Sequence, residues 1–573
     1  MRPLRLPGEL RAVVDESVER ALADRWARRI WARDVSIWTD DEAVGERIAS
    51  RLGWLEAPET FHERVEELEA FAAGVGIEGF RAAVVLGMGG SSLAPETLAR
   101  SLEPGAHGIP VTVLDSTDPA AVLAIRRRCD PERTLYLVAS KSGTTTETLS
   151  FLRYFWALED DLHGAIPDSL PGEHFVAITD PGRPLESIPH QAAFRSVFLN
   201  PANVGGRYSA LTFVGLVPAA LMDLQLGRLL DEGVGMAELC RDEGPENPGI
   251  GLGIALGELA RHGRDKLTFL LEPSIAAFGD WVEQLIAEST GKKGVGIVPI
   301  VGEAPAEPAD YGTDRVFVRL GPEDAEAWRS ESDAVLDALA ELGHPVLDLA
   351  SGAGGGLGGE FVRWEFATAV AGAVLGIDPF DEPNVTESKE NTSRVLERFA
   401  AEGRLPEVEP LVADGPLTLY GDAALRLTGP HADVRAELER HFARARPSGY
   451  FALQAYIAPT AARDESLARL RRLLGTRMRR ATTLGYGPRF LHSTGQLHKG
   501  GPSTGCFIQL TGGHPEDVPI PGRQETFGVL IDAQAMGDFA SLERHDLPVL
   551  RVHLSDDPDA GLAALERALG QPA

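Results

Sequence analysis

Short apolar segments that alternate with helical stretches constrain the fold of this chain more than any other feature of its sequence. The first series, each read as a buried strand, comprises Ala82–Leu86, Val111–Leu114, Thr134–Ala139 and Phe175–Thr179. The second series comprises Lys266–Leu271, Gly296–Ile300, Arg315–Leu320 and Val346–Leu349. Further strands are predicted at Leu417–Tyr420, Tyr450–Ala455, Cys506–Leu510 and Val549–His553. Alternating strands and helices predict an α/β fold with parallel sheets, whose ligands bind beyond the carboxyl ends of the strands.

The chain is too long for one core. With 573 residues it exceeds the size at which a single hydrophobic core stops growing. We predict a helical N-terminal segment over residues 1–75, a first α/β domain over 76–235 and a second over 236–400. Residues 401–573 are expected to form a C-terminal α/β segment.

Composition excludes several classes of function. The net charge of -30 is opposite to that of a typical nucleic-acid-binding protein. The sequence contains no run of eighteen uncharged apolar residues, so we expect no membrane-spanning helix. Met1–Arg33 lacks the apolar stretch of a secretory signal. Three widely spaced cysteines favour a reducing compartment, so we expect a cytoplasmic protein. An acidic chain can still bind an anionic substrate, but only at a locally positive site.

Two polar loops follow predicted strands and open predicted helices. Gly87–Ser92 is glycine-rich, which lets a ligand approach the backbone, although a tight turn would look the same. Ser140–Thr146 gathers hydroxyls, free N–H groups and Lys141 at a helix start, which suits a phosphate monoester. The alternative for this second loop is a capping cluster on a surface helix. It is not a Walker loop, because the glycine spacing is missing.

Four further motifs make a resemblance specific. These are Val204–Ser209 (VGGRYS), Glu288–Lys292 (ESTGK), Asp378–Lys389 (DPFDEPNVTESK) and Leu491–Gln496 (LHSTGQ). Together with the two loops they resemble the phosphoglucose isomerase family, from about residue 82 to residue 500. The resemblance implies two sugar-isomerase domains, flavodoxin-like and of three αβα layers, with parallel sheets, plus helical N-terminal and C-terminal extensions. It also implies a sugar phosphate substrate and a homodimer, in which one chain can lend a residue to its neighbour's site.

The resemblance assigns roles residue by residue. Glu288 matches the general base, Arg207 the arginine that stabilises the enediolate, and His492 with Lys389 the pair involved in ring opening. The residues expected around the substrate and its phosphate are Gly90, Ser91, Ser140, Lys141, Ser142, Thr144, Thr145, Gly206 and His498.

Aldose–ketose exchange is compatible with this set of residues. The reaction needs one base between two adjacent carbons, positive charge near the developing enediolate oxygen, and an acid–base group for the ring oxygen. We therefore expect no cofactor and no metal. Conversion between glucose 6-phosphate and fructose 6-phosphate, in glycolysis and gluconeogenesis, is the expected reaction.

Departures from the family pattern leave alternatives open. Lys389 precedes His492 by about a hundred residues, an inverted motif order that resembles the isomerase half of transaldolase–phosphoglucose isomerase fusion proteins. His498, six residues after His492, is the rival ring opener. Glu382 stands where the family commonly has glutamine. A non-catalytic phosphosugar-binding regulator, or an isomerase that also accepts mannose 6-phosphate, is the alternative function.

Overall fold

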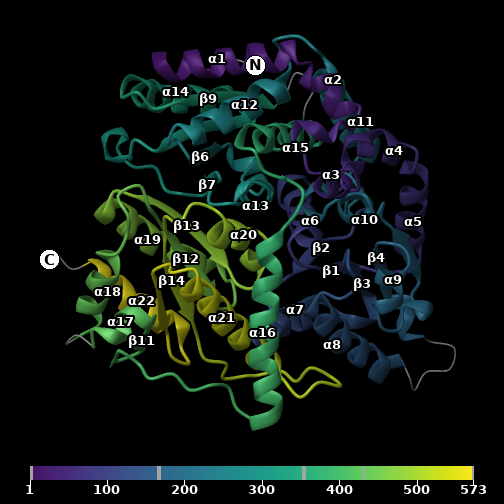
Figure 1. Cartoon of the computed structure of the whole chain (residues 1–573). Helices are drawn as coiled ribbons and strands as arrows, with labels where there is room; N and C mark the ends of the chain where they lie inside the picture. The colour runs from purple at the N-terminus through teal and green to yellow at the C-terminus, as the bar shows by residue number, and fades with distance from the viewer. Residues whose placement is uncertain (1–3, 164–169, 352–355, 430–432, 571–573) are drawn as a thin grey trace.

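The strands of the chain gather into three sheets, as the computed structural model of residues 4–163, 170–351, 356–429 and 433–570 shows (Figure 1). The first sheet has the order β2-β1-β3-β4-β5, and all of its pairings are parallel. Its strands are β1 (Ala82–Leu86), β2 (Val111–Leu114), β3 (Thr134–Ala139), β4 (Phe175–Thr179) and β5 (Ser196–Leu199). Every residue of β3 is buried, as expected of a central strand that helices cover on both faces.

The second sheet is also parallel, with the order β7-β6-β8-β9. Its strands are β6 (Lys266–Leu271), β7 (Val298–Ile300), β8 (Arg315–Pro322) and β9 (Val346–Ser351). Arg5, close to the N-terminus, forms an antiparallel bridge with Val346 of β9. The N-terminal helices therefore begin beside the second sheet, although the first sheet follows them in the sequence.

The third sheet is mixed, with the order β10-β11-β15-β14-β12-β13. Its strands are β10 (Val412–Asp414), β11 (Leu417–Gly421), β12 (Tyr450–Tyr456), β13 (Ala481–Tyr486), β14 (Gly505–Thr511) and β15 (Val549–His553). Pairings that involve β10 and β11 are antiparallel, whereas the other four strands run parallel. The C-terminal part of the chain is thus an α/β unit with its own buried core.

Helices cover the faces of these sheets. Those up to residue 241, before the second sheet in the sequence, are α1 (Gly8–Ala23), α2 (Trp26–Trp31), α3 (Glu42–Ala49), α4 (Ala57–His62), α5 (Val65–Ile77), α6 (Gly90–Ser101), α7 (Pro119–Arg128), α8 (Thr146–His163), α9 (Arg183–Ser187), α10 (Phe213–Leu221) and α11 (Leu226–Arg241). Those of the second sheet are α12 (Pro248–Arg261), α13 (Phe278–Thr290), α14 (Glu326–Glu341) and α15 (Leu357–Leu375). Those that follow are α16 (Pro383–Glu402), α17 (Ala423–Leu427), α18 (Val434–Phe442), α19 (Ala461–Met478), α20 (Gly495–Gly500), α21 (Phe527–Arg544) and α22 (Pro558–Gly570).

Helix α16 joins the second and third sheets. Figure 1 shows it as a long green helix between the blue first-sheet region and the yellow-green third-sheet region, beside α21. Its N-cap residue is Glu382. The start of the motif at residues 378–389 contacts Arg207, Lys292 and Gln496, so it lies where the three regions meet. The predicted α/β class, with parallel sheets and added N-terminal and C-terminal regions, is confirmed. Within the described residues, no helix is both long and apolar enough to cross a membrane.

Candidate active site

A cleft of about 600 Å³ opens at the carboxyl edge of the first sheet. The segments that follow β1, β3, β4 and β5 line one side of it, as expected of a ligand site in a parallel sheet. Helix α13, the start of α16 and His492 line the other side. The residues of the sequence prediction that line this cleft are Gly90, Ser91, Lys141, Ser142, Thr145, Gly206, Arg207, Glu288, Lys389 and His492.

The hydroxyl-rich loop after β3 ends at the N-terminus of α8. Ser142 Oγ accepts a hydrogen bond from the Thr144 backbone N–H at 3.3 Å, which holds the loop in a tight turn. Gly143 has φ of 64°, and a Cβ there would lie 1.8 Å from the Pro184 carbonyl oxygen, so only glycine fits. The free N–H groups of the helix start, together with the hydroxyls, form an anion-binding arrangement.

Two residues predicted around the phosphate do not line the cleft. Ser140 is buried, and its Oγ lies 3.1 Å from Thr145 Oγ1, so it supports the loop from behind. Thr144 lines an adjoining cavity of about 110 Å³ together with Glu147 and His492. Neither side chain is among the residues that line the main cleft.

The glycine-rich turn after β1 packs directly on the loop that carries Arg207. A Cβ on Gly90 would lie 2.3 Å from the carbonyl carbon and oxygen of Gly206. The two backbones therefore approach so closely that a side chain at residue 90 cannot be accommodated without displacement. This contact sets the position of Arg207, the next residue along the chain.

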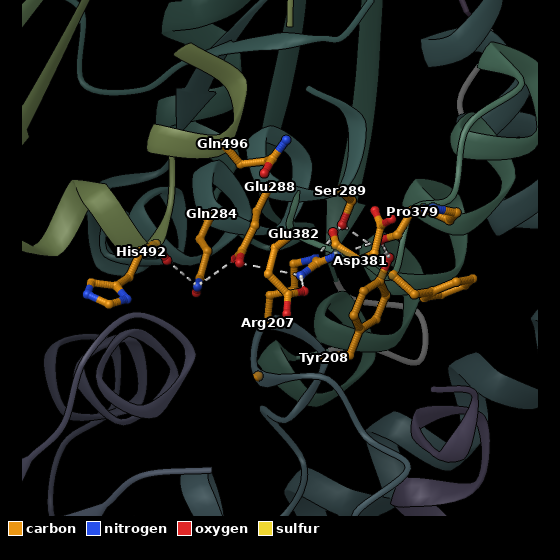
Figure 2. Close-up of polar contacts among 12 residues, drawn as sticks. Arg207, Tyr208, Gln284, Glu288, Ser289, Pro379, Asp381, Glu382, His492 and Gln496 are labelled. Carbon is orange, nitrogen blue, oxygen red and sulfur yellow. Dashed lines mark hydrogen bonds and ion pairs between the residues drawn. The ribbon is translucent and has the colours of Figure 1, made fainter. Parts of the chain in front are cut away.

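Arg207 and Glu288 form a buried ion pair in the cleft (Figure 2). Arg207 Nη1 lies 3.5 Å from Glu288 Oε1, and the two side chains are 2% and 9% exposed. The guanidinium donates from Nε to Ser289 Oγ at 2.8 Å and from Nη2 to the carbonyl oxygens of Pro379 and Asp381, each at 2.9 Å. With these donors engaged, Nη1 is the group that faces the carboxylate and the cleft.

Glu288 is held by a second partner on its own helix. Gln284, one turn earlier on α13, donates Nε2 to Glu288 Oε2 at 3.0 Å and to the backbone oxygen of His492 at 2.7 Å. Burial raises the pKa of Glu288, Arg207 opposes this effect, and the charge of Glu382 adds to it. The result is a carboxylate of increased basicity in a fixed orientation.

The turn at residues 378–382 closes the cleft beside Arg207. Glu382 Oε2 lies 3.2 Å from Arg207 Nη1, so the guanidinium is shared between two carboxylates. Lys292 fixes the same turn, since its Nζ donates to the Asp378 carbonyl at 2.6 Å and lies 2.8 Å from Asp381 Oδ1. Burial lowers the pKa of Lys292 to about 8. Lys389, further along α16, is exposed and lines both the cleft and the adjoining cavity.

His492 lies at the opposite end of the cleft and contacts a carboxylate from the first sheet's region. Its Nε2 is 3.1 Å from Glu147 Oε1, and Gln534 donates Nε2 to the same oxygen at 2.6 Å. Thr117 donates in turn to Gln534 Oε1 at 2.7 Å. Although burial opposes it, His492 lowers the pKa of Glu147, so this carboxylate is charged at neutral pH. His492 is thereby oriented by a buried network.

His498 lies elsewhere, among aromatic rings. Its ring centroid is 5.0 Å from that of Phe507 and 6.1 Å from that of Phe490, and the side chain does not line the cleft. Burial lowers its pKa to about 3, so the imidazole is neutral. His498 therefore lies outside the cleft that His492 lines, which separates the two candidate histidines.

The described residues offer one cluster with metal-ligand chemistry, formed by Glu159, His163 and His174. All three side chains are buried, and none lines the cleft. His174 Nδ1 lies 3.0 Å from the Thr134 carbonyl oxygen, a backbone contact of a structural kind.

Comparison with known proteins identifies the family. A sequence profile described as Phosphoglucose isomerase matches residues 33–241. The chain is 30% identical to the glucose-6-phosphate isomerase of Rubrobacter xylanophilus over 395 residues, which span 61% of this chain and 90% of that protein. The chain belongs to the phosphoglucose isomerase family. Another member, from Thermus thermophilus, is 28% identical over 393 residues, 61% of this chain and 90% of its own.

Solved structures support the family's fold in this chain. A hypothetical protein from Thermus thermophilus superposes with a TM-score of 0.56 at 25% identity, over 70% of this chain and all of that one. A glucose-6-phosphate isomerase from Chlamydia trachomatis superposes with a TM-score of 0.50 at 19% identity, over 65% of this chain and 78% of that one.

Sequence reasoning missed several residues of this family site. Arg51 and Asp180 line the cleft, and Glu147 and Gln534 hold His492. Gln284 carried a detectable signal, because it lies four residues before Glu288 and so on the same helix face. Gln534 lies in Ala533–Asp538, a segment that shares the resemblance, but its role could not be predicted because only the packing of helix α21 brings it to Glu147.

Proposed function

We propose that this chain is a glucose-6-phosphate isomerase, which interconverts glucose 6-phosphate and fructose 6-phosphate through an enediolate intermediate. One observation carries the proposal: a buried carboxylate, Glu288, lies 3.5 Å from the Arg207 guanidinium in a cleft that joins a phosphate-type loop to His492. Relatives named glucose-6-phosphate isomerase share most of their length with this chain, which supports the same reaction here.

Glu288 acts as the general base. It takes the proton from C2 of the open-chain aldose and returns it to C1, or the reverse for the ketose. A base that works near neutral pH benefits from a raised pKa, and burial supplies that shift. Gln284 keeps one carboxylate oxygen engaged, so the other faces Arg207 and the reacting carbons.

Arg207 stabilises the enediolate. Although burial opposes it, Glu288 and Glu382 raise the pKa of Arg207, so the guanidinium stays charged. Three of its hydrogen bonds go to fixed acceptors of the protein. A charge that is already oriented needs no reorganisation when negative charge develops on the substrate oxygen.

His492 and Lys389 serve ring opening, with His492 transferring the proton of the ring oxygen. Glu147 holds the imidazole in place through Nε2. Ser91, Ser142, Thr145 and Lys141 hold the phosphate at the start of α8.

We also propose the finer features. The enzyme acts in the cytoplasm, in glycolysis and gluconeogenesis, as a homodimer. The inverted order of Lys389 and His492 supports a relationship to the isomerase half of transaldolase–phosphoglucose isomerase fusion proteins. The division at residues 75, 235 and 400 agrees with the succession of the sheets, each of which lies within one of the proposed segments.

A coupled assay tests the function. Purified protein receives fructose 6-phosphate without added metal or nucleotide, and glucose 6-phosphate is detected. Glu288→Gln should lower kcat by roughly 10²- to 10⁴-fold, the usual contribution of a general base. The matched control is Glu283→Gln on the same helix, outside the cleft. Burial raises the pKa of Glu283 to about 8, so the amide replaces a largely neutral group. Near-normal turnover in Glu288→Gln would remove it as the base.

A further inference from the structure

At the end of the cleft formed by the loop after β3, none of the cationic residues predicted from the sequence is free of a protein carboxylate. Among the described residues that line it, four are cationic: Arg51, Lys141, Arg207 and Lys389. Arg207 is shared between Glu288 and Glu382. Lys389 lies toward His492, because it also lines the adjoining cavity beside Glu147. The end of the cleft formed by the loop after β3 therefore depends on the other two.

Lys141 is already engaged by the protein. Its Nζ forms an ion pair with the Asp180 carboxylate and donates to the Ala202 carbonyl at 3.1 Å. Asp180 itself lines the cleft, so a negative charge stands at the proposed phosphate end. Burial raises the pKa of Asp180, whereas Lys141 and Arg51 oppose that effect. The Lys141–Asp180 pair thus adds little net positive charge for a phosphate that carries about −1.5 to −2 at pH 7.

Arg51 lies next to this pair and keeps its donors. Within the part of the chain that the structure describes, its guanidinium has no hydrogen bond and no ion pair. Its position is nevertheless fixed by the backbone. Leu52 bridges Val204, and the Gly53 N–H donates to the Asn203 carbonyl at 2.9 Å. The segment after α3 is therefore fastened to the same loop that carries Gly206 and Arg207.

We propose that Arg51 binds the phosphate group of the sugar phosphate and supplies the charge that Lys141 shares with Asp180. This inference rests on the proposed function, because it assigns a further substrate-binding residue to the same cleft. A guanidinium presents a planar fork of donors that matches phosphate oxygens, and its pKa keeps it charged throughout the working range. The hydroxyls and helix N–H groups of residues 142–146 would bind the remaining oxygens.

Initial-rate kinetics with fructose 6-phosphate, and competition by inorganic phosphate, test the assignment. Arg51→Ala should raise both the KM for fructose 6-phosphate and the inhibition constant of phosphate by roughly ten- to a hundredfold, the loss expected for a charge-assisted hydrogen bond. The kcat should stay within about twofold, because Arg51 binds substrate and transition state alike. For Arg51→Lys, both constants should lie between those of the unmodified protein and those of Arg51→Ala, because lysine keeps the charge but lacks the planar fork of donors.

The matched control is Arg47→Ala, an exposed arginine one turn earlier on α3 that does not line the cleft. Kinetic constants of Arg51→Ala equal to those of Arg47→Ala would overturn the assignment. So would a lower kcat with unchanged phosphate inhibition. If circular dichroism shows that Arg51→Ala does not fold, Arg51→Gln is used instead. Its KM for fructose 6-phosphate and its inhibition constant for phosphate are then compared with those of Arg47→Ala.

Direct phosphate binding separates this inference from the proposed function. If the unmodified protein shows no isomerase activity, the function fails, and inorganic phosphate is titrated by calorimetry instead. Weaker phosphate binding by Arg51→Ala than by Arg47→Ala would still support the assignment. Equal binding by the two variants, or no binding to the unmodified protein, would overturn it.

Discussion

Arg207 is shared between two carboxylates, and both charges act, beside burial, on the pKa of Glu288. Glu288 Oε1 and Glu382 Oε2 lie 3.5 and 3.2 Å from the same nitrogen. The family commonly has glutamine at the position of Glu382, so this chain carries an additional negative charge beside the proposed base. Its repulsion is one of the effects that raise the pKa of Glu288.

Glu382→Gln should shift the pH dependence of the isomerase. Removing this charge removes a repulsion and lowers the pKa of Glu288. A general base works only when deprotonated, so the acid limb of the kcat/KM profile should move to lower pH. The profile is measured between about pH 5 and 9. Glu390→Gln, an exposed substitution on the same helix, is the control. An unchanged limb, or one displaced to higher pH, would contradict the coupling.

At the scale of elements, the cleft depends on two turns that touch through their backbones. Gly90 at the start of α6 packs on Gly206, which precedes Arg207. No side chain separates the turns, so the distance between the phosphate-type loops and the guanidinium is set by glycine.

Gly90→Ala should therefore impair both stability and activity. A Cβ placed 2.3 Å from fixed backbone atoms forces the turns apart, and overpacking of this kind costs about 1–3 kcal/mol. The free energy of unfolding is measured by denaturant titration and kcat/KM by the coupled assay. Gly235→Ala in α11 is the opposite case: no atom lies within 4 Å of its added Cβ. It should stabilise the helix by about 0.5–1 kcal/mol and leave turnover unchanged. Equal effects of the two substitutions would argue against a steric role for Gly90.

The elements that the sequence predicted, and those it missed, differ in where they lie in a sheet. Central strands such as β3 and β12 are buried throughout and are mostly apolar in sequence. The strands that sequence reasoning missed, β5, β10 and β13, all lie at sheet edges; exposed residues interrupt β5 and β10, and half of β13 is only partly buried. The same limit applies to the site. Arg207 and Glu288 lie in recognisable motifs, whereas Arg51 and Gln534 reach it only through tertiary packing.

At the scale of the whole molecule, each of the three sheets and its helices contributes residues to the site. Glu147 comes from α8, Glu288 from α13 and His492 from the segment after β13. Gln284 links the latter two within one chain by donating to both. His492 lines the cleft of its own chain, so one chain brings together the proposed base and the proposed histidine.

Mixing two inactive variants should therefore restore no activity. Glu288→Gln and His492→Ala are purified, unfolded together, refolded and assayed. If each chain supplies its own base and histidine, every site in the mixture lacks one of them. Sites built across a two-fold interface would instead give about a quarter of the normal activity, because half of the molecules would be heterodimers with one intact site. Recovery near that level would contradict a site completed within one chain.

The place of His492 in the third sheet's region also links catalysis to the order in which the chain is made. The proposed phosphate loops and base are complete once the first two sheets have formed, but the histidine and Gln534 arrive only with the last one. A chain cleaved in α16 would lack the histidine that we propose for ring opening. Turnover would thus report that synthesis and assembly of all three regions are finished, a built-in check on maturation.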